Sequence, residues 1–317
     1  MRIASLLASG TEIAWSLGLG DDVVAISHEC DYPSELLDRP RITRPRFDPR
    51  DLDSGEIDAA VRQAMERHGG VYEIDDAALR DARPDLLLTQ AVCEVCAVPA
   101  DDARAVVARM DEAPTVHSLD AHTLDGILET ILQVGAAAGV EQRAERCVAD
   151  LRGRLEAASR AVAGRPRPRV LGLEWLDPPF LPGHWVPEMI EIAGGANLRG
   201  RAGARSVEAA WKDLRDLDPD VLVVMPCGYD LDAARRDADE HANRLVELAR
   251  HAVEAGRAYV VDASSYFNRS GPRVVDGVEI LAALLHPGAA PEVDLEGRAA
   301  VWAPRIHGSA ETSEERA

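Results

Sequence analysis

Short runs of apolar residues alternate along the chain with longer segments whose apolar positions recur at steps of three and four residues. The short runs are typical of strands buried in a parallel sheet, and the longer segments are typical of amphipathic helices. Strands are predicted at residues 3–7, 23–26, 86–88, 115–119, 169–173, 221–223 and 258–261. Because strands and helices alternate, the pattern predicts an α/β fold with parallel sheets and helical crossovers.

The helical segments and loops complete this pattern. A first helix is predicted to end at residue 19, and others are predicted at 57–67, 103–110, 187–192, 206–214, 232–253 and 275–285. Residues 38–56 are rich in Arg, Asp and Pro and are expected to form a loop. The acidic stretch after Pro287 is rich in Pro, Gly and Ser, and a loose tail is expected there.

One short pattern occurs twice. A helix end, a Pro-Asp pair and a buried apolar run follow one another around Pro84 and again around Pro219. The two copies lie on either side of a long helical segment from His122 to about Ala163. This internal repeat predicts two similar α/β lobes, one before and one after the helical segment.

The helical segment allows two interpretations. As one unbroken helix it would be a spine of roughly 60 Å between the lobes. The alternative is two ordinary helices with a turn near Gly139. The predicted boundaries are an N-terminal lobe at 1–120, a connecting helix at 121–165, a C-terminal lobe at 166–290 and a loose acidic tail at 291–317.

Composition narrows the choice of partners and compartment. The chain has 317 residues, 46% of them hydrophobic, and a net charge of −20, which would repel the phosphates of nucleic acid. Five cysteines, an odd number, argue against a disulfide framework. No secretory signal or membrane-spanning stretch is recognisable, so a cytoplasmic monomer is expected. The alternative is a periplasmic or extracytoplasmic protein whose leader has been removed.

Ligands of open parallel sheets bind beyond the carboxyl ends of the strands. Aromatic residues gather in the loops predicted at those ends, although only 4% of the chain is aromatic. They are Tyr32, Trp175, Phe180, Trp185, Tyr229, Tyr266 and Phe267. Rigid rings with a few polar groups suit a large, flat, partly apolar ligand, so these residues are predicted to bind one. The alternative is that two or three of them close the tops of the lobes.

The same loops carry polar candidates for ligand binding. These are His28, Glu29, Gln90, Cys93, Glu174, His184, Cys227 and Arg269. His184 is the candidate for an axial nitrogen on a metal in the ligand, or else a hydrogen-bonding cap. Glu174 is expected either to accept hydrogen bonds from ligand amides or to pair with Arg269.

Cys93 and Cys96 form a Cys-x-x-Cys pair, and with Cys227 they would suit zinc or a metal cluster. Buried structural thiols are the alternative. The sequence contains no glycine-rich phosphate loop and no nucleophile elbow. We therefore predict a binding protein rather than an enzyme, and assign no catalytic residue.

Several separated segments resemble a known family. They are SGTEIAWSLGLGDDVVAISHECDYP, LLLTQAVCEVCAVP, LEWLDPPFLPGHWVPEMIEIAGG, PCGYD and YFNRSGPRVVDGVEILAALLHP. Over about residues 2–287 the chain is similar to the cobalamin-binding branch of the helical-backbone substrate-binding proteins of ABC transporters. The resemblance implies two Rossmann-like lobes with parallel sheets, bridged by a long α-helix, with a ligand cleft between them and little hinge motion.

The resemblance also implies a function. The ligand would be cobalamin or a related corrinoid or metal chelate, with no cofactor required, presented to an ABC permease or handled in the cell. The alternative is a cytoplasmic metal- or cluster-binding protein, or an enzyme, using Cys93, Cys96 and Cys227. Receptors of this type carry a docking Glu before each Pro-Asp strand. Ala77 and Lys212 stand at those places here, which weakens the prediction of a permease partner.

Overall fold

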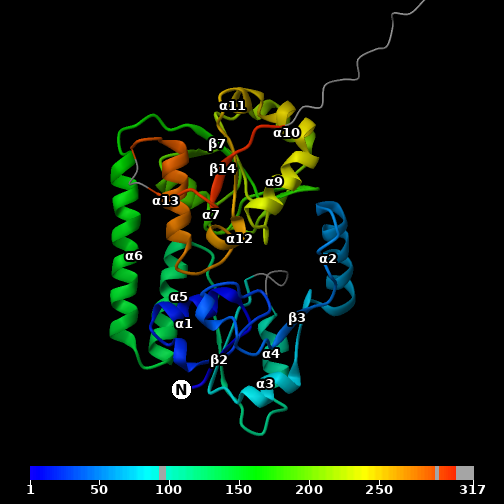
Figure 1. The fold of residues 1–317 in the computed structure, drawn as a ribbon, viewed down its shortest axis with the longest axis vertical. Helices are drawn as coiled ribbons and strands as arrows, with labels where there is room; N and C mark the ends of the chain where they lie inside the picture. Colours follow the sequence, from blue (N-terminus) through cyan, green and yellow to red (C-terminus); the bar gives the residue numbers. More distant parts are fainter. Residues whose placement is uncertain (93–97, 290–292, 305–317) are drawn as a thin grey trace, which may run out of the picture.

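The computed structural model describes residues 1–92, 98–289 and 293–304 and has two α/β lobes, one above the other in Figure 1. The N-terminal lobe contains the parallel sheet β2-β1-β5-β6. Its strands are β1 (Ile3–Ser5), β2 (Val23–Ala25), β5 (Leu86–Thr89) and β6 (Thr115–Ser118). Helices α1 (Ala8–Ser16), α3 (Asp76–Ala82) and α4 (Ala100–Val107) belong to the same lobe. The predicted parallel sheet of this lobe is confirmed.

The C-terminal lobe repeats this plan with the sheet β10-β7-β12-β13-β14. Four neighbouring strands are parallel: β10 (Ala196–Asn197), β7 (Arg169–Leu173), β12 (Val221–Val224) and β13 (Ala258–Val261). The last strand, β14 (Ala299–Val301), pairs antiparallel to β13. The expectation of a loose tail is wrong for this stretch, because Trp302 is also buried and donates a hydrogen bond to Asp239.

The Pro-Asp repeat has the same geometry in both lobes. Asp85 accepts a hydrogen bond from the backbone nitrogen of Arg2 at 2.7 Å, and Asp220 accepts one from that of Arg169 at 2.7 Å. The residue before each proline is left-handed, with φ of 42° at Arg83 and 38° at Asp218. In each copy the aspartate thus ties the incoming strand to the first strand of its lobe, which explains why the pair recurs.

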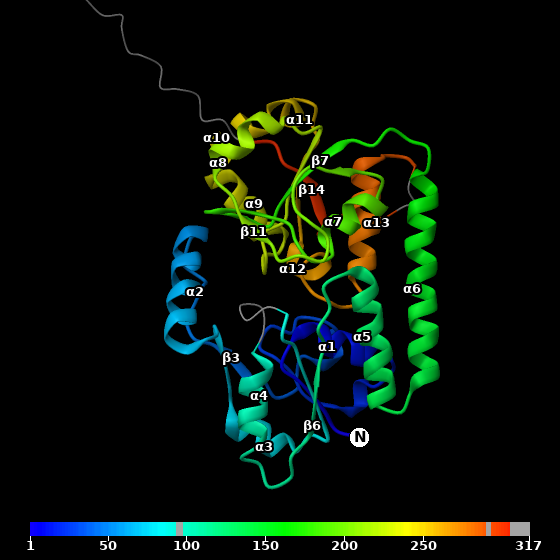
Figure 2. The same cartoon turned by 180° about the vertical axis from the view of Figure 1, so that it is seen from behind.

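Of the two interpretations of the helical segment, the structure has the second, because the segment forms two helices, α5 (Leu124–Ala137) and α6 (Glu141–Val162). Gly139, at φ +69°, makes the turn between them. A Cβ on Gly135 would lie 2.3 Å from the Ala144 side chain, so glycine allows the two helices to approach closely. Helix α6 packs on α5 and on α13 (Val274–Leu285), and it runs alongside both lobes in Figures 1 and 2. The bridging element is therefore α6, about 33 Å long.

The remaining elements lie around the two sheets. In the first lobe they are β3 (Thr43–Pro45), inside the predicted loop, β4 (Tyr72–Ile74) and α2 (Ser54–His68). In the second they are β8 (Trp175–Leu176), β9 (Pro179–Leu181), α7 (Val186–Ile192), β11 (Val207–Glu208), α8 (Trp211–Leu214) and α12 (Ala263–Tyr266). The predicted helix at 232–253 is three helices, α9 (Leu231–Glu240), α10 (Ala242–Leu248) and α11 (Arg250–Glu254). Within the described residues, no helix is both long and apolar enough to cross a membrane.

Candidate functional site

The carboxyl ends of the two sheets face each other across the junction of the lobes. Ser9, after β1, lies 3.3 Å through its Oγ from the Oγ of Ser270, which follows β13. On another side of the junction, α2 contacts β8, and Arg62 pairs with Glu208 at 2.8 Å. The segments after β1 and β13 therefore meet between the lobes, at the edge where open parallel sheets bind ligands.

A buried charged cluster joins the lobes at this edge. Glu12 of α1 is only 2% exposed and receives hydrogen bonds from Arg273 at 2.6 and 3.1 Å. Arg269 pairs with Asp31, in the loop after β2, and lies 3.5 Å from Glu12. Burial opposes the charged form of Asp31, yet the hydrogen bond and charge of Arg269 hold its pKa below the ordinary value. The cluster thus contains two carboxylates from one lobe and two guanidinium groups from the other.

An aromatic cluster lies on the C-terminal side of the junction. The rings of Trp175 and Tyr229 are 5.1 Å apart between centroids, and Phe180 pairs with Trp175 across β8 and β9. The indole nitrogen of Trp175 donates to the carbonyl oxygens of Ser54 and Asp177, each at 3.1 Å. Burial raises the pKa of Tyr229, so its phenol stays protonated at neutral pH. These three aromatics are half-buried and form one fixed surface.

His28 and Glu29 form a second polar group in the N-terminal lobe. His28 Nδ1 is 2.6 Å from the hydroxyl of Thr43, and its Nε2 is 3.0 Å from Glu29. Tyr72 lies edge-on to the imidazole at 4.8 Å. The hydrogen bond from His28 lowers the pKa of Glu29, which is therefore an acceptor at neutral pH. Glu29 remains partly exposed, whereas the imidazole is held by its neighbours.

His184 and Trp185 lie in the segment before α7 and have different surroundings. Trp185 is buried in the core and donates to the Phe267 carbonyl at 2.7 Å. The prediction that Trp185 faces ligand is therefore wrong, because its ring and its N–H are already used. His184 has a left-handed backbone, φ 49°, and stacks on His122 at 5.6 Å. Burial lowers its pKa, so the imidazole is neutral.

The other predicted polar residues have mixed outcomes. Glu174 is buried and accepts a hydrogen bond from Ser206. Of the two roles predicted for it, the pair with Arg269 does not form, because Arg269 pairs with Asp31. Gln90 is buried after β5.

The predicted aromatic residues Tyr32 and Tyr266 both lie near Arg273. Tyr32 is 41% exposed beneath Arg273, whose guanidinium carbon is 4.5 Å from the ring centre. The same guanidinium lies 5.6 Å from the ring of Tyr266.

The cysteines give no metal site among the described residues. Cys227 is an exposed free thiol, and Cys93 and Cys96 lie outside the described residues. No group of three or more His, Cys, Asp or Glu suited to a metal ion exists in the part of the chain that the structure describes.

The sequence did not predict a role for Arg273 or the burial of Glu12. The apolar neighbours of Glu12 were the available signal, since a charge on a buried face needs a partner.

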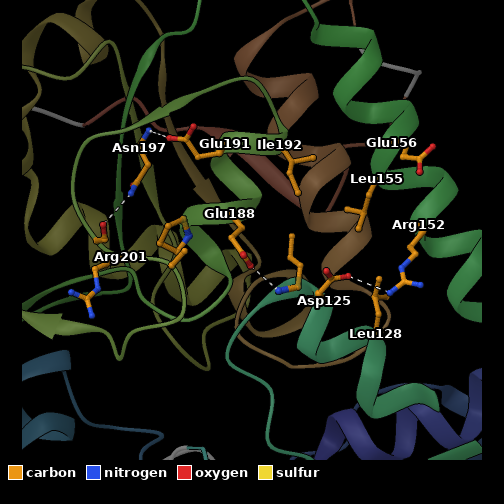
Figure 3. A pocket seen from close by; sticks show the side chains of 14 residues that line it. Asp125, Leu128, Arg152, Leu155, Glu156, Glu188, Glu191, Ile192, Asn197 and Arg201 are labelled. Carbon is orange, nitrogen blue, oxygen red and sulfur yellow. Dashed lines mark hydrogen bonds and ion pairs between the residues drawn. The ribbon is translucent and has the colours of Figure 1, made fainter. Parts of the chain in front are cut away.

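A cavity of about 610 Å³ lies between α5, α6, α7 and the residues after β10 (Figure 3). Leu128, Leu155 and Ile192 contribute apolar surface, and Glu188 at its edge accepts a hydrogen bond from the backbone nitrogen of Leu124 at 2.8 Å. None of the predicted ligand residues lines it. The cavity is therefore distinct from the candidate site.

Two similar α/β lobes, a bridging helix and facing strand-end loops define a two-lobed ligand-binding protein. The periplasmic binding protein family model matches residues 3–264, so the chain belongs to that family. The resemblance seen in the sequence is thereby confirmed. The fold class predicted from the sequence is confirmed as well.

Relatives of known name are distant but cover most of the chain. An uncharacterized ABC transporter substrate-binding lipoprotein, YvrC of Bacillus subtilis, is 24% identical over 298 residues, covering 90% of this chain and 80% of that protein. The vitamin B12-binding protein of Vibrio cholerae is 23% identical over 282 residues, covering 88% and 86%. The expectation of a cytoplasmic protein is wrong in the light of these relatives, one of which is a lipoprotein of an ABC transporter.

Solved structures show the same fold. A periplasmic heme-binding protein from Pseudomonas aeruginosa has a TM-score of 0.68 at 22% identity, covering 92% of this chain and 95% of that one. The periplasmic vitamin B12 binding protein BtuF of Vibrio cholerae has a TM-score of 0.65 at 22% identity, covering 90% and 96%. Both are named as periplasmic proteins, and their likeness to this chain shows the fold that it shares with them.

Proposed function

We propose that this protein binds cobalamin or a closely related corrinoid between its lobes, outside the cytoplasm, and presents it to an ABC importer. It acts by binding and not by catalysis. The lobes are those bounded at about residues 120 and 166, with the segment between them as the bridge. The relatives named for vitamin B12 and for ABC transport support this proposal.

The observation that carries the proposal is the fixed position of Trp175. Its indole N–H is held by two carbonyl oxygens, one from each lobe, and its ring lies against Tyr229. An aromatic surface that is ordered before the ligand arrives loses little conformational entropy on binding. A flat macrocycle would bury one face on this surface and gain from apolar contact.

The charges near the site favour a corrinoid over heme. A corrin ring carries neutral amides that donate hydrogen bonds, and Glu29 is an ionised, partly exposed acceptor. Heme carries two carboxylates, which need cationic partners. Arg269 and Arg273 are already paired with Asp31 and Glu12, so they are not free to bind heme carboxylates.

Heme is the second candidate because of the His184 imidazole and the names of several solved structures. His184 is a neutral imidazole, and its Nδ1 has no hydrogen-bond partner among the described residues. A neutral imidazole is a good ligand for iron and for cobalt. Three solved structures of the same fold are named as heme-binding proteins, and a fourth is a complex with heme.

A titration panel tests the proposal. Purified protein is titrated with cyanocobalamin, hemin and a ferric siderophore, and binding is followed by equilibrium dialysis and visible spectra. Binding of cyanocobalamin at least tenfold tighter than hemin is the expected result, whereas the opposite order would replace the corrinoid by heme. Leu155→Trp, which fills the cavity of Figure 3, is the control and should leave the affinity unchanged.

A further inference from the structure

Arg269 belongs to the C-terminal lobe, yet most of its hydrogen bonds reach the loop after β2 in the N-terminal lobe. Its Nη2 donates to the Glu29 carbonyl oxygen at 3.0 Å and to an Asp31 carboxylate oxygen at 2.9 Å. Its Nη1 also binds Asp31. The side chain is 12% exposed and receives further support from Ser264 at 3.1 Å. A planar guanidinium that binds a carboxylate with two nitrogens fixes orientation as well as distance.

Arg273, four residues further on, contacts Tyr32, the residue that follows Asp31 in the same loop. Its guanidinium lies over the Tyr32 ring at 4.5 Å, and two of its nitrogens bind Glu12. Glu12 is buried in α1, so it provides a fixed anchor for this arginine. The two arginines therefore hold consecutive groups of one loop from the opposite lobe.

A third arginine holds the same loop from within its own lobe. Arg41 Nη1 donates to the carbonyl oxygens of Ser27, His28 and Cys30 at 3.0, 2.9 and 2.9 Å. The loop backbone is thus fixed at one end by its own lobe and at the other end by Arg269. The part that Arg41 does not reach is Asp31 and Tyr32, and this is the part that the opposite lobe controls.

We infer that Arg269 and Arg273 are positioning residues, which hold the 29–32 loop in its ligand-binding arrangement without contacting the ligand themselves. The inference rests on the proposed function for the part that this loop plays in ligand binding. It replaces the sequence-based prediction that Arg269 binds the ligand directly. It also means that the affinity of the 29–32 loop for the ligand depends on contacts that the C-terminal lobe makes with this N-terminal loop.

Amide hydrogen exchange without ligand tests the positioning, and cyanocobalamin affinity tests its consequence. In Arg269→Met, the peptide covering residues 27–36 should exchange faster, and cyanocobalamin should bind about tenfold more weakly. Arg269→Lys should recover only part of both effects, because an ammonium does not reproduce the two-nitrogen contact. Asp31→Asn, at a half-exposed side chain, should reproduce the Arg269→Met pattern without threatening the fold.

Arg154→Met is the matched control. Arg154 also binds two carboxylates, those of Asp276 and Glu279, but it joins α6 to α13 away from the loop. Its loss should leave the exchange of residues 27–36 and the affinity unchanged. Unaltered exchange of this peptide in Arg269→Met would overturn the inference, and weaker binding with unaltered exchange would show a direct ligand contact instead. If the wild type does not bind cyanocobalamin, the proposed ligand is wrong, while the exchange comparison still decides the positioning.

Discussion

Replacing Glu12 by Gln tests whether the buried charged cluster holds the two lobes together. The substitution keeps the size of the side chain and removes one negative charge at a position that is 2% exposed. Arg273 then loses the carboxylate that it contacts at 2.6 and 3.1 Å, and the cluster gains a net charge of one. Breaking a buried ion pair in this way costs about 3–5 kcal/mol.

The expected cost here is about 2–3 kcal/mol of unfolding free energy, because Gln still accepts one hydrogen bond and Asp31 still neutralises one guanidinium. Urea denaturation followed by circular dichroism gives the midpoint and the slope. Calorimetry adds a second test, since loss of the link between the lobes should broaden or split the thermal transition.

The control for this experiment is Glu279→Gln, which removes a carboxylate from Arg154 between α6 and α13. Both side chains of that pair are partly exposed, at 21% for Glu279 and 40% for Arg154. Pairs with this much solvent contact contribute about 1 kcal/mol or less. If Glu12→Gln costs no more than Glu279→Gln, the cluster does not stabilise the lobe junction and the reasoning fails.

Four further predictions follow from particular residues. Trp185→Ala should lower unfolding free energy by about 3–5 kcal/mol, measured by urea denaturation, because its ring is in the core. Trp302→Ala should also destabilise, by about 3 kcal/mol in the same assay, and an unchanged midpoint would contradict the packing of β14. The pKa of Asp31 is lowered on folding, so the stability that its carboxylate contributes is present above the ordinary carboxyl pKa and is lost as the pH falls through the folded pKa. The melting temperature of Asp31→Asn, measured between pH 3 and 7, should therefore fall less on acidification than that of the wild type. Scattering profiles with and without cyanocobalamin should nearly superimpose, because α6 packs on both lobes, and a large fall in the radius of gyration would contradict this.

The sequence predicted the two-lobe plan because that plan depends on local patterns. The Pro-Asp pairs at Pro84 and Pro219 recur because each aspartate makes the same hydrogen bond to its first strand. The strand at 169–173 is buried and apolar throughout its last four residues, so its bounds were predicted without error. Such features need only neighbouring residues or a short repeat to be recognised.

The features that the sequence did not decide depend on packing outside the local pattern. An apolar period passes through Gly139 whether the helix continues or turns, so both interpretations stayed open, and the packing of Gly135 on Ala144 favours the turn. Strand β14 is only three residues long, too short for its apolar run to be distinctive, and its partner β13 stabilises it. Arg269 has carboxylates available in both lobes, and only the folded arrangement selects Asp31 over Glu174.

For the candidate site, the sequence indicates which residues follow the strands but not which of them are buried. Strand-end positions follow from the order of strands, which brought Trp175, Phe180 and Tyr229 to one surface. Burial within a loop does not follow from that order. Trp185 therefore looked equivalent to Trp175, although its N–H binds Phe267 inside the core.

The most direct test of the central claim is the affinity of wild type and Trp175→Ala for cyanocobalamin, measured under identical conditions. The account predicts one binding site in the wild type and about thirtyfold weaker binding in the variant, a difference of about 2 kcal/mol. Equal affinities of the two proteins, or no binding by the wild type, would contradict a corrinoid bound against Trp175 between the lobes.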